Sequence, residues 1–267
     1  ERLAPFLDKV HYTFVESMPA CEHGDPWDCE NAHRELLTVA FLDAGGVDED
    51  MVVVSDADEF PRASAAWALA HCAVPEKLHI LTEFYYFSAH CHVPWPDMRL
   101  KAVSGRVLKT VGAQAVRKER KSQYHYHIGE AGWENLTDGG FHLSYFMSPE
   151  GMADKVTAFA HTEFNRYPFN TAAWHLENAE ACTFSVDWVH VQAEYVRTTE
   201  LRYPQVPWYA LESPEAMHRF FAYRRLEEDD DEAALLQEAQ MRKSAEDSPI
   251  AVCITGQLRR QSHWNDV

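Results

Sequence analysis

Several common motifs are absent from this 267-residue sequence, and each absence narrows the classes of protein that it fits. The six cysteines include no C-x-x-C pair, so they fit neither a zinc ribbon nor a thioredoxin-type motif, and the sequence does not show how any disulfides would pair. No internal repeat is present, which argues against a solenoid. A glycine-rich phosphate loop and a G-x-S-x-G are also missing, which argues against P-loop nucleotide binding and a hydrolase nucleophile of that type.

Long apolar runs are missing as well. No stretch is long enough to span a bilayer and no signal peptide is visible, so the sequence predicts no direct membrane span in this chain. Because the sequence begins with Glu1 rather than Met, it leaves open a longer protein with a targeting segment before this point.

Positive charge is scarce, with 24 Lys and Arg against 42 Asp and Glu and a formal net charge of -18. Such a chain repels phosphate backbones and anionic lipids, so we expect no nucleic-acid partner. Part of the excess is an unbroken acidic run at residues 227–232, which is typical of a solvated helix face or a disordered tail. The dense basic cluster is RKERK at residues 117–121, either a solvated loop or a clamp on a diphosphate.

The stretch MVVVSDADEFPR, residues 51–62, dominates the interpretation. Its four leading apolar residues predict a short buried strand, and Asp56, Asp58 and Glu59 follow where that strand would leave the sheet. Three carboxylates there are costly unless a cation or strong hydrogen-bond donors occupy the site. A solvated acidic turn is the alternative, but the oxygen ligands suit Mg²⁺ or Mn²⁺ shared with substrate phosphates.

The remaining patterns predict a chain of alternating strands and helices, and hence an α/β fold with a mainly parallel sheet. We predict strands at residues 9–15, 78–88, 140–147 and 250–255. We predict helices from residue 28 or 29 to 44, from 64 to 72 with Ser64 as the N-cap, and over 148–160, 171–181 and 213–243. Trp95, between two prolines, is expected in a rigid loop, and a structural role is expected for the His90-Cys91-His92 triplet.

Two stretches, taken with the residues around them, carry a family resemblance. Trp27, Glu30 and Arg34 in WDCENAHRE precede VVVSDADEFPR, and GFHLSYFMSPEGMADKVTAFAHTEF follows at residues 140–164. Together these resemble glycosyltransferase family 17 over roughly residues 1–208. The resemblance implies a nucleotide-diphospho-sugar transferase (GT-A-like) sheet with flanking helices.

The resemblance also implies an activity. This is inverting transfer of N-acetylglucosamine from a UDP-sugar donor to a mannose-containing N-glycan, with a glycan or glycoprotein as the acceptor. The resemblance also implies assistance by Mn²⁺ or Mg²⁺ and a place in the Golgi or secretory lumen. Asp56 and Asp58 match the acidic motif of the family. Phe60 and Phe141 depart from it, where an aliphatic residue and a Trp are usual. A further amino-terminal strand and helix of the family have no counterpart here, so we expect an incomplete chain that is weak or inactive on its own.

The expected roles follow from this chemistry. Asp58, with Asp56, is the candidate metal ligand. Glu163 is the first candidate for the base that inversion requires and Glu59 the second, although an exposed acid at a helix end explains Glu163 equally well. His142 is a further catalytic candidate, placed to orient the base or the sugar.

Donor binding needs positive charge beside these acids, because one divalent ion does not offset three carboxylates and a diphosphate. Arg62 is fixed next to the motif and is the first candidate, followed by Arg117 and Arg120, whose guanidinium groups suit phosphate. His161 is the fourth candidate for the donor site.

Two other functions stay open, and three segments are predicted. Asp56 after an apolar strand also suits the nucleophile of a phosphohydrolase, and a non-catalytic sugar-binding derivative fits a chain that lacks part of the family's domain.

We predict a catalytic domain at residues 1–212, a polar acidic helical extension at 213–247, and the strand-like start of a truncated segment at 248–267.

Overall fold

The computed structural model describes residues 4–18, 25–118, 132–186, 189–196, 207 and 257–258. Within it the chain divides into two compact units. Unit 1 comprises Glu1–Thr82, Met98–Gly140 and Ala251–Val267, and unit 2 comprises Glu83–Asp97 and Phe141–Ile250. Strands β3 (Lys77–Tyr86) and β6 (Glu134–Ser144) each contribute residues to both units. The fold is mixed α/β, a central sheet with flanking helices, as predicted from the sequence.

The strand before the acidic motif, β1 (Met51–Val54), lies inside the sheet of unit 1, between β5 (Lys101–Ser104) and β10 (Gln257–Leu258). All four of its residues are buried, so the predicted central strand is confirmed. The expectation of a mainly parallel sheet is wrong for the ladders of known direction, because β1 pairs antiparallel with both neighbours and β3 pairs antiparallel with β5. An apolar run indicates burial on both faces, and helices on both faces bury an antiparallel strand equally well.

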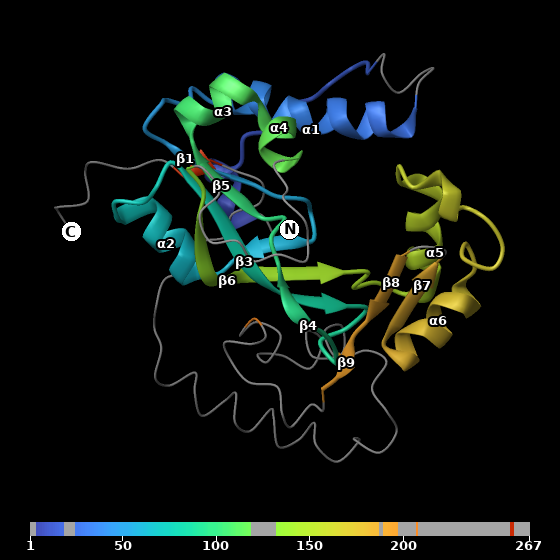
Figure 1. Cartoon of the computed structure of the whole chain (residues 1–267). Coiled ribbons are helices and arrows are strands. Elements are labelled where there is room, and N and C mark those ends of the chain that lie inside the picture. The colour runs from blue at the N-terminus through green and yellow to red at the C-terminus, as the bar shows by residue number, and fades with distance from the viewer. Residues whose placement is uncertain are drawn as a thin grey trace. The chain divides into compact units, whose positions relative to one another are not determined.

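Two apolar clusters cover the two faces of β1. The helices that contribute to them are labelled α1, α2, α3 and α4 in Figure 1. On one face Val52 and Val54 pack against helices α1 (Pro26–Asp43), α3 (Gly105–Val111) and α4 (Ala113–Lys118), through Phe41, Leu108 and Val116. On the other face Met51 and Val53 pack with Leu69 of α2 (Ala63–His71). This packing fixes the point at which the chain leaves β1, and therefore the position of the acids that follow.

Local capping residues explain the helix ends of unit 1. Asp25 caps α1 by accepting a hydrogen bond from the Trp27 backbone N–H at 2.9 Å, so the helix begins two or three residues before the predicted start. It ends as predicted, at Ala44 followed by Gly45 with φ of 74°. Helix α2 begins at Ala63, so Ser64 lies inside it and is not the N-cap.

The strand expected at residues 9–15 does not form. A 3-10 helix, η1 (Ala4–Lys9), precedes residues 10–18, which are neither helix nor strand. The alternating aromatic residues there stay in solvent, with Tyr12 79% exposed and Phe14 69% exposed. A period-two pattern specifies a strand only when a neighbouring strand and a core receive its apolar face.

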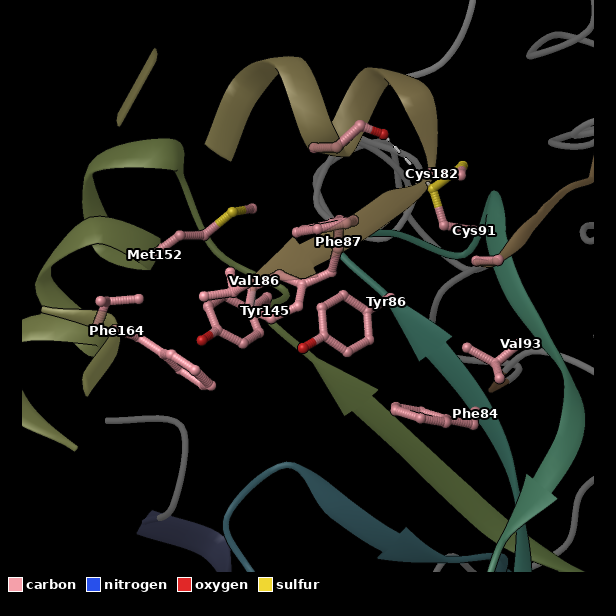
Figure 2. Close-up of a cluster of buried hydrophobic side chains, with 14 residues drawn as sticks. Phe84, Tyr86, Phe87, Cys91, Val93, Tyr145, Met152, Phe164, Cys182 and Val186 are labelled. Atoms are coloured by element: carbon pink, nitrogen blue, oxygen red, sulfur yellow. Dashed lines mark hydrogen bonds between the residues drawn. A yellow bond between two sulfur atoms is a disulfide. The ribbon is translucent and has the colours of Figure 1, made fainter. Parts of the chain in front are cut away.

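Unit 2 is built around an aromatic core that includes Phe84, Tyr86, Phe87 and Tyr145 (Figure 2). Strands β4 (Cys91–Asp97), β9 (Glu194–Tyr195), β7 (Thr183–Val186) and β8 (Val189–Gln192) belong to it, with helices α5 (Pro149–Ala158) and α6 (Ala172–Ala181) and the 3-10 helix η3 (Thr162–Phe164). Serine and proline begin α5 as predicted, and the Ser148 hydroxyl accepts a hydrogen bond from the Gly151 N–H at 3.2 Å. The predicted short helix ending at Ala181 is also confirmed, with Thr171 as its N-cap.

Trp95 lies in strand β4, not in the predicted loop. Strand β4 lies between β3 and β9, and its ladder with β9 covers only Cys91 and His92. Pro94 and Pro96 lie beyond this ladder, so β9 does not require the N–H that a proline lacks.

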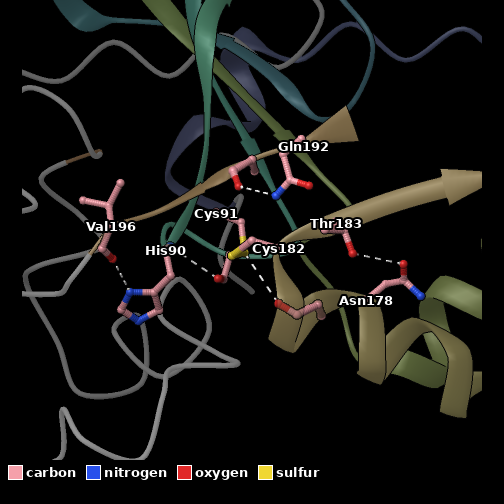
Figure 3. The surroundings of a disulfide bond; sticks show 10 residues. His90, Cys91, Asn178, Cys182, Thr183, Gln192 and Val196 are labelled. Carbon is pink, nitrogen blue, oxygen red and sulfur yellow. Dashed lines mark hydrogen bonds between the residues drawn. A yellow bond between two sulfur atoms is a disulfide. The ribbon is translucent and has the colours of Figure 1, made fainter. Parts of the chain in front are cut away.

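A disulfide joins Cys91 of β4 to Cys182 at the end of α6 (Figure 3). Next to it, the Nδ1 atom of His90 lies 2.9 Å from the Val196 carbonyl oxygen. The structural interpretation of the His-Cys-His triplet is therefore confirmed for its cysteine.

The predicted helix at residues 213–243 and strand at 250–255 lie outside the described residues. In the part of the chain that is described, no helix combines the length and apolarity needed to cross a membrane.

Candidate active site

The acids that follow β1 form a tight turn, residues 56–59, which we call the acidic turn. The Glu59 backbone N–H donates to the Asp56 carbonyl oxygen at 3.2 Å, and the Asp56 N–H donates to the Glu59 carboxylate at 3.2 Å. The Glu59 side chain is buried, whereas Asp56 and Asp58 are half-buried. The turn thus faces one acid inward and leaves two aspartates within reach of solvent.

Arg117, in the last turn of α4, binds two of these acids at once. Its Nη1 atom donates to Glu59 Oε2 at 2.7 Å, and its Nη2 atom donates to Asp56 Oδ2 at 2.7 Å and also to Glu59 Oε1. Nη1 also donates to the Arg99 carbonyl oxygen. A planar guanidinium is suited to such bidentate pairing, which lysine does not provide.

Arg34, on α1, reaches the same turn from the other helix. Its Nη2 atom lies 3.3 Å from Asp56 Oδ1 and 2.8 Å from Glu30 Oε1, and its Nη1 atom donates to the Gln114 side-chain oxygen at 3.0 Å. The side chain is 14% exposed. Asp56 therefore accepts a guanidinium on each of its two carboxylate oxygens.

These contacts determine the charge state of the turn. Burial raises the pKa of Asp56, but the charges and hydrogen bonds of Arg117 and Arg34 outweigh burial, so the pKa lies below its usual value. Asp56 is accordingly ionised at neutral pH. The two guanidinium groups offset Asp56 and Glu59, and Asp58 adds a third carboxylate to the turn.

The acidic turn fits a hard divalent cation. Asp58 and Glu59 each offer a carboxylate oxygen, and these oxygens lie within 4.8 Å of each other. Oxygen ligands at such a separation suit Mg²⁺ or Mn²⁺.

The first candidate for donor binding, Arg62, is tied to β6. Its backbone N–H donates to the Gly139 carbonyl at 2.8 Å, Nε donates to the Asp138 carbonyl at 3.0 Å, and Nη2 lies 2.5 Å from Asp138 Oδ1. The side chain is buried. The guanidinium that binds Asp56 and Glu59 is that of Arg117, and Arg120 lies outside the described residues.

His142 and Glu163 belong to unit 2. His142 is buried in β6, with its Nδ1 atom 3.0 Å from Asp97 Oδ2 and its ring stacked on Phe84 at 4.4 Å between centroids. A carboxylate on one ring nitrogen fixes the tautomer of a histidine, which suits a group that handles a proton.

Glu163 and His161 form an exposed pair, with His161 Nδ1 2.7 Å from Glu163 Oε1. The slight burial of Glu163 raises its pKa. The hydrogen bond and charge of His161 lower the pKa by more than burial raises it, so the pKa lies below its usual value. A lowered pKa keeps the carboxylate ionised and at the same time makes it a weaker base.

Arg34 is the site residue that sequence reasoning did not assign. Two signals pointed to it: its position four residues after Glu30 on a helix face, where ion pairs form, and its place in WDCENAHRE. Neither signal indicates the contact with Asp56, which joins residues 22 positions apart.

A mixed α/β sheet with flanking helices, and acids at the end of a buried strand, is consistent with a glycosyltransferase fold. The sequence model of glycosyltransferase family 17 matches residues 1–172, more than half of the chain. The chain therefore belongs to glycosyltransferase family 17 and is by family a glycosyltransferase. No curated protein and no solved structure matched the chain.

Proposed function

We propose that this chain transfers N-acetylglucosamine from UDP-N-acetylglucosamine to a mannose-containing N-glycan, with inversion at the anomeric carbon. The observation that carries the proposal is the acidic turn at the end of β1, with Asp56 and Glu59 bound to one arginine, in a member of glycosyltransferase family 17. Fixed acids and fixed cations side by side suit a diphosphate that arrives with a divalent cation.

The carboxylates of the acidic turn, Asp58 first among them, would hold Mn²⁺ or Mg²⁺. When bound, the cation would offset the charge that develops on the leaving UDP. Arg62, Arg117 and Arg120, with His161, are the proposed donor-binding residues. Arg117 would serve the donor site by offsetting the charge of Asp56 and Glu59, which it already binds, beside the diphosphate.

For the base we retain Glu163, which His161 keeps ionised and oriented. Glu59 suits this role less well, because its side chain is 1% exposed and both of its oxygens bind Arg117. We propose that His142, whose tautomer Asp97 fixes, orients the acceptor or carries its proton.

The Cys91–Cys182 disulfide supports a place in the secretory lumen, such as the Golgi. Disulfides form and persist in oxidising compartments and are rare in the cytosol. A lumenal protein would also meet N-glycan acceptors there.

The decisive experiment is a transfer assay with the purified chain and a mannose-containing N-glycan. UDP-N-acetylglucosamine, UDP-glucose and UDP-galactose would be supplied separately with Mn²⁺, and the products weighed by mass spectrometry, with the new linkage assigned by NMR. We expect one added N-acetylhexosamine in a β linkage with UDP-N-acetylglucosamine alone, and no product with chelator or with Asp58→Asn.

Other outcomes would assign a different function. Metal-dependent hydrolysis of a generic phosphate ester that is lost in Asp56→Asn would favour the phosphohydrolase. Metal-dependent binding of UDP-N-acetylglucosamine without transfer to any acceptor would favour the non-catalytic sugar-binding protein.

A further inference from the structure

The two aspartates of the acidic turn have different surroundings. Asp56 gives one carboxylate oxygen to each of two arginines, Oδ1 to Arg34 at 3.3 Å and Oδ2 to Arg117 at 2.7 Å. Asp58 instead has an oxygen within 4.8 Å of a Glu59 oxygen, an arrangement that suits a shared cation. The same short turn therefore contains one aspartate whose two oxygens are both bound by arginines and one that has an oxygen near a Glu59 oxygen.

We propose that Arg34 and Arg117 are positioning residues that hold Asp56 and Glu59 in the acidic turn, so that Asp56 serves the site through these arginines rather than as a ligand of the cation that the proposed function assigns to Asp58. This inference rests on the proposed function, since it assigns the parts of the same donor site.

The number of acceptors that each guanidinium serves supports this role. Arg117 donates to both Glu59 oxygens, to Asp56 and to the Arg99 carbonyl. Arg34 serves Asp56, Glu30 and Gln114. Each arrangement needs several donors in one plane, which an ammonium group lacks. Both side chains are largely buried, so each contact is made at a fixed position.

The helices that carry the two arginines are themselves bonded together. The Gln114 N–H, in α4, donates to Glu35 Oε2 of α1 at 2.9 Å, and the Ala113 N–H donates to the Thr38 hydroxyl at 2.8 Å. Arg34 completes this connection through Gln114. The arginines are thus mounted on a rigid pair of helices, which is the support that a preorganised site requires.

The experiment compares metal and nucleotide binding in the full chain by calorimetry, first with Mn²⁺ alone and then with UDP in saturating Mn²⁺. The variants are Asp58→Asn, Asp56→Asn, Arg34→Gln and Arg34→Lys. Lys109→Gln is the matched control, because it removes an ion pair with Asp48 on the exposed surface.

We expect Asp58→Asn to weaken Mn²⁺ binding at least tenfold, since a charged ligand is lost. Asp56→Asn should keep Mn²⁺ affinity within about threefold but weaken UDP binding about tenfold. Arg34→Gln removes a positive charge, so Mn²⁺ should bind as tightly or more tightly while UDP binds about tenfold more weakly. Arg34→Lys should not restore UDP binding, and Lys109→Gln should change neither affinity.

The opposite results would overturn the inference. If Asp56→Asn abolishes Mn²⁺ binding as Asp58→Asn does, Asp56 is a direct ligand. If Arg34→Gln weakens Mn²⁺ and UDP binding in parallel with its thermal stability, or if Arg34→Lys restores UDP binding, the arginine is not a positioning residue. A wild-type chain that binds Mn²⁺ but no UDP would refute the proposed function and leave the Mn²⁺ comparison to decide between the aspartates. A chain that binds no Mn²⁺ refutes both.

Discussion

Glu59 and Arg117 form a bidentate ion pair in which the side chains are only 1% and 5% exposed. Burying two charges is costly, and the cost is offset only when the remaining polar positions are also bonded. Here the Asp56 N–H donates to Glu59, and the Arg99 carbonyl accepts from Arg117. The pair therefore belongs to the framework that shapes the acidic turn, and removing either member leaves a buried charge.

Truncating this pair is expected to destabilise the protein severely. Glu59→Ala should lower the free energy of unfolding by about 3–5 kcal/mol, because Arg117 would remain buried without its carboxylate. Urea denaturation followed by circular dichroism measures the change. The exposed Lys109–Asp48 pair supplies the control, and Lys109→Ala should leave the curve nearly unchanged. A loss in Glu59→Ala as small as that of the control would mean that solvent reaches Arg117.

The acid limb of the stability curve should depend on Asp56. Its pKa in the folded chain is below the unfolded value of 3.8, so its contribution is complete above that value and is lost as pH falls through the folded pKa. Urea titrations at about pH 5 to 2 should show a shallower acid loss in Asp56→Asn than in the wild type. Identical slopes in the two proteins would show that the arginines do not hold this carboxylate in its charged form.

The sequence predicted the acids of the site but not their partners, for a physical reason. A buried strand followed by acids is a local pattern, and MVVVSDADEFPR displays it within twelve residues. The contacts of Asp56 with Arg34 and Arg117 span 22 and 61 positions. Only the packing of α1 and α4 on the same face of β1 brings these three residues together.

The fold shows the same division between local and long-range information. The serine-proline start of α5 and the glycines after α1 depend on neighbouring residues, and both were predicted. Strand direction depends on which segments pair in the folded chain. The antiparallel pairing of β1 with β5 is not indicated by any sequence pattern within either segment. The false strand at residues 9–15 had the right residue types but no partner among the described residues to bury them.

Replacing His175 by phenylalanine should stabilise unit 2 at acidic pH. His175 is fully buried on α6 against Tyr145 and Trp174, and neither ring nitrogen has a hydrogen-bond partner of good geometry among the described residues. Burial lowers its pKa to about 4, with the Phe169 backbone offsetting part of the effect. The unfolded chain therefore takes up a proton first as pH falls below 6.5.

This linkage costs up to about 1.4 kcal/mol of stability for each pH unit between 6.5 and 4. Thermal melts across that range should show a shallower decline in His175→Phe. His79, with a pKa of about 4 beside Lys101, keeps its own contribution in both proteins. An unchanged slope in the variant would mean that His175 is protonated inside the folded unit.

The disulfide of unit 2 should make a large contribution to stability. Cys91 and Cys182 are 91 residues apart, and closing a loop of that size in the unfolded chain is worth about 4 kcal/mol or more. Cys182→Ala should lower the unfolding free energy by about that amount, because the unfolded variant chain is no longer closed by this disulfide. Cys72→Ala, at an exposed cysteine outside this disulfide, is the control and should behave as the wild type does. Equal stability of all three proteins would contradict the prediction.

A glycine between α3 and α4 links backbone geometry to the site. Gly112 has φ of 80° and ψ of 157°, a region that residues with a side chain rarely enter. A Cβ added there would lie 2.3 Å from Glu35 Oε1. Glu35 also accepts the Gln114 N–H, which places the start of the helix that carries Arg117.

Gly112→Ala should therefore harm both stability and nucleotide binding. Backbone strain is expected to cost about 1–3 kcal/mol, and the displaced Glu35 should shift α4 and weaken UDP binding in saturating Mn²⁺ severalfold. Gly132→Ala is the matched control, because Gly132 has φ of 85° but nothing within 4 Å of an added Cβ. It should lose stability through strain alone and bind UDP normally. Denaturation curves and calorimetry separate the two effects, and equal UDP affinity in both variants would show that the Glu35–Gln114 contact does not position Arg117.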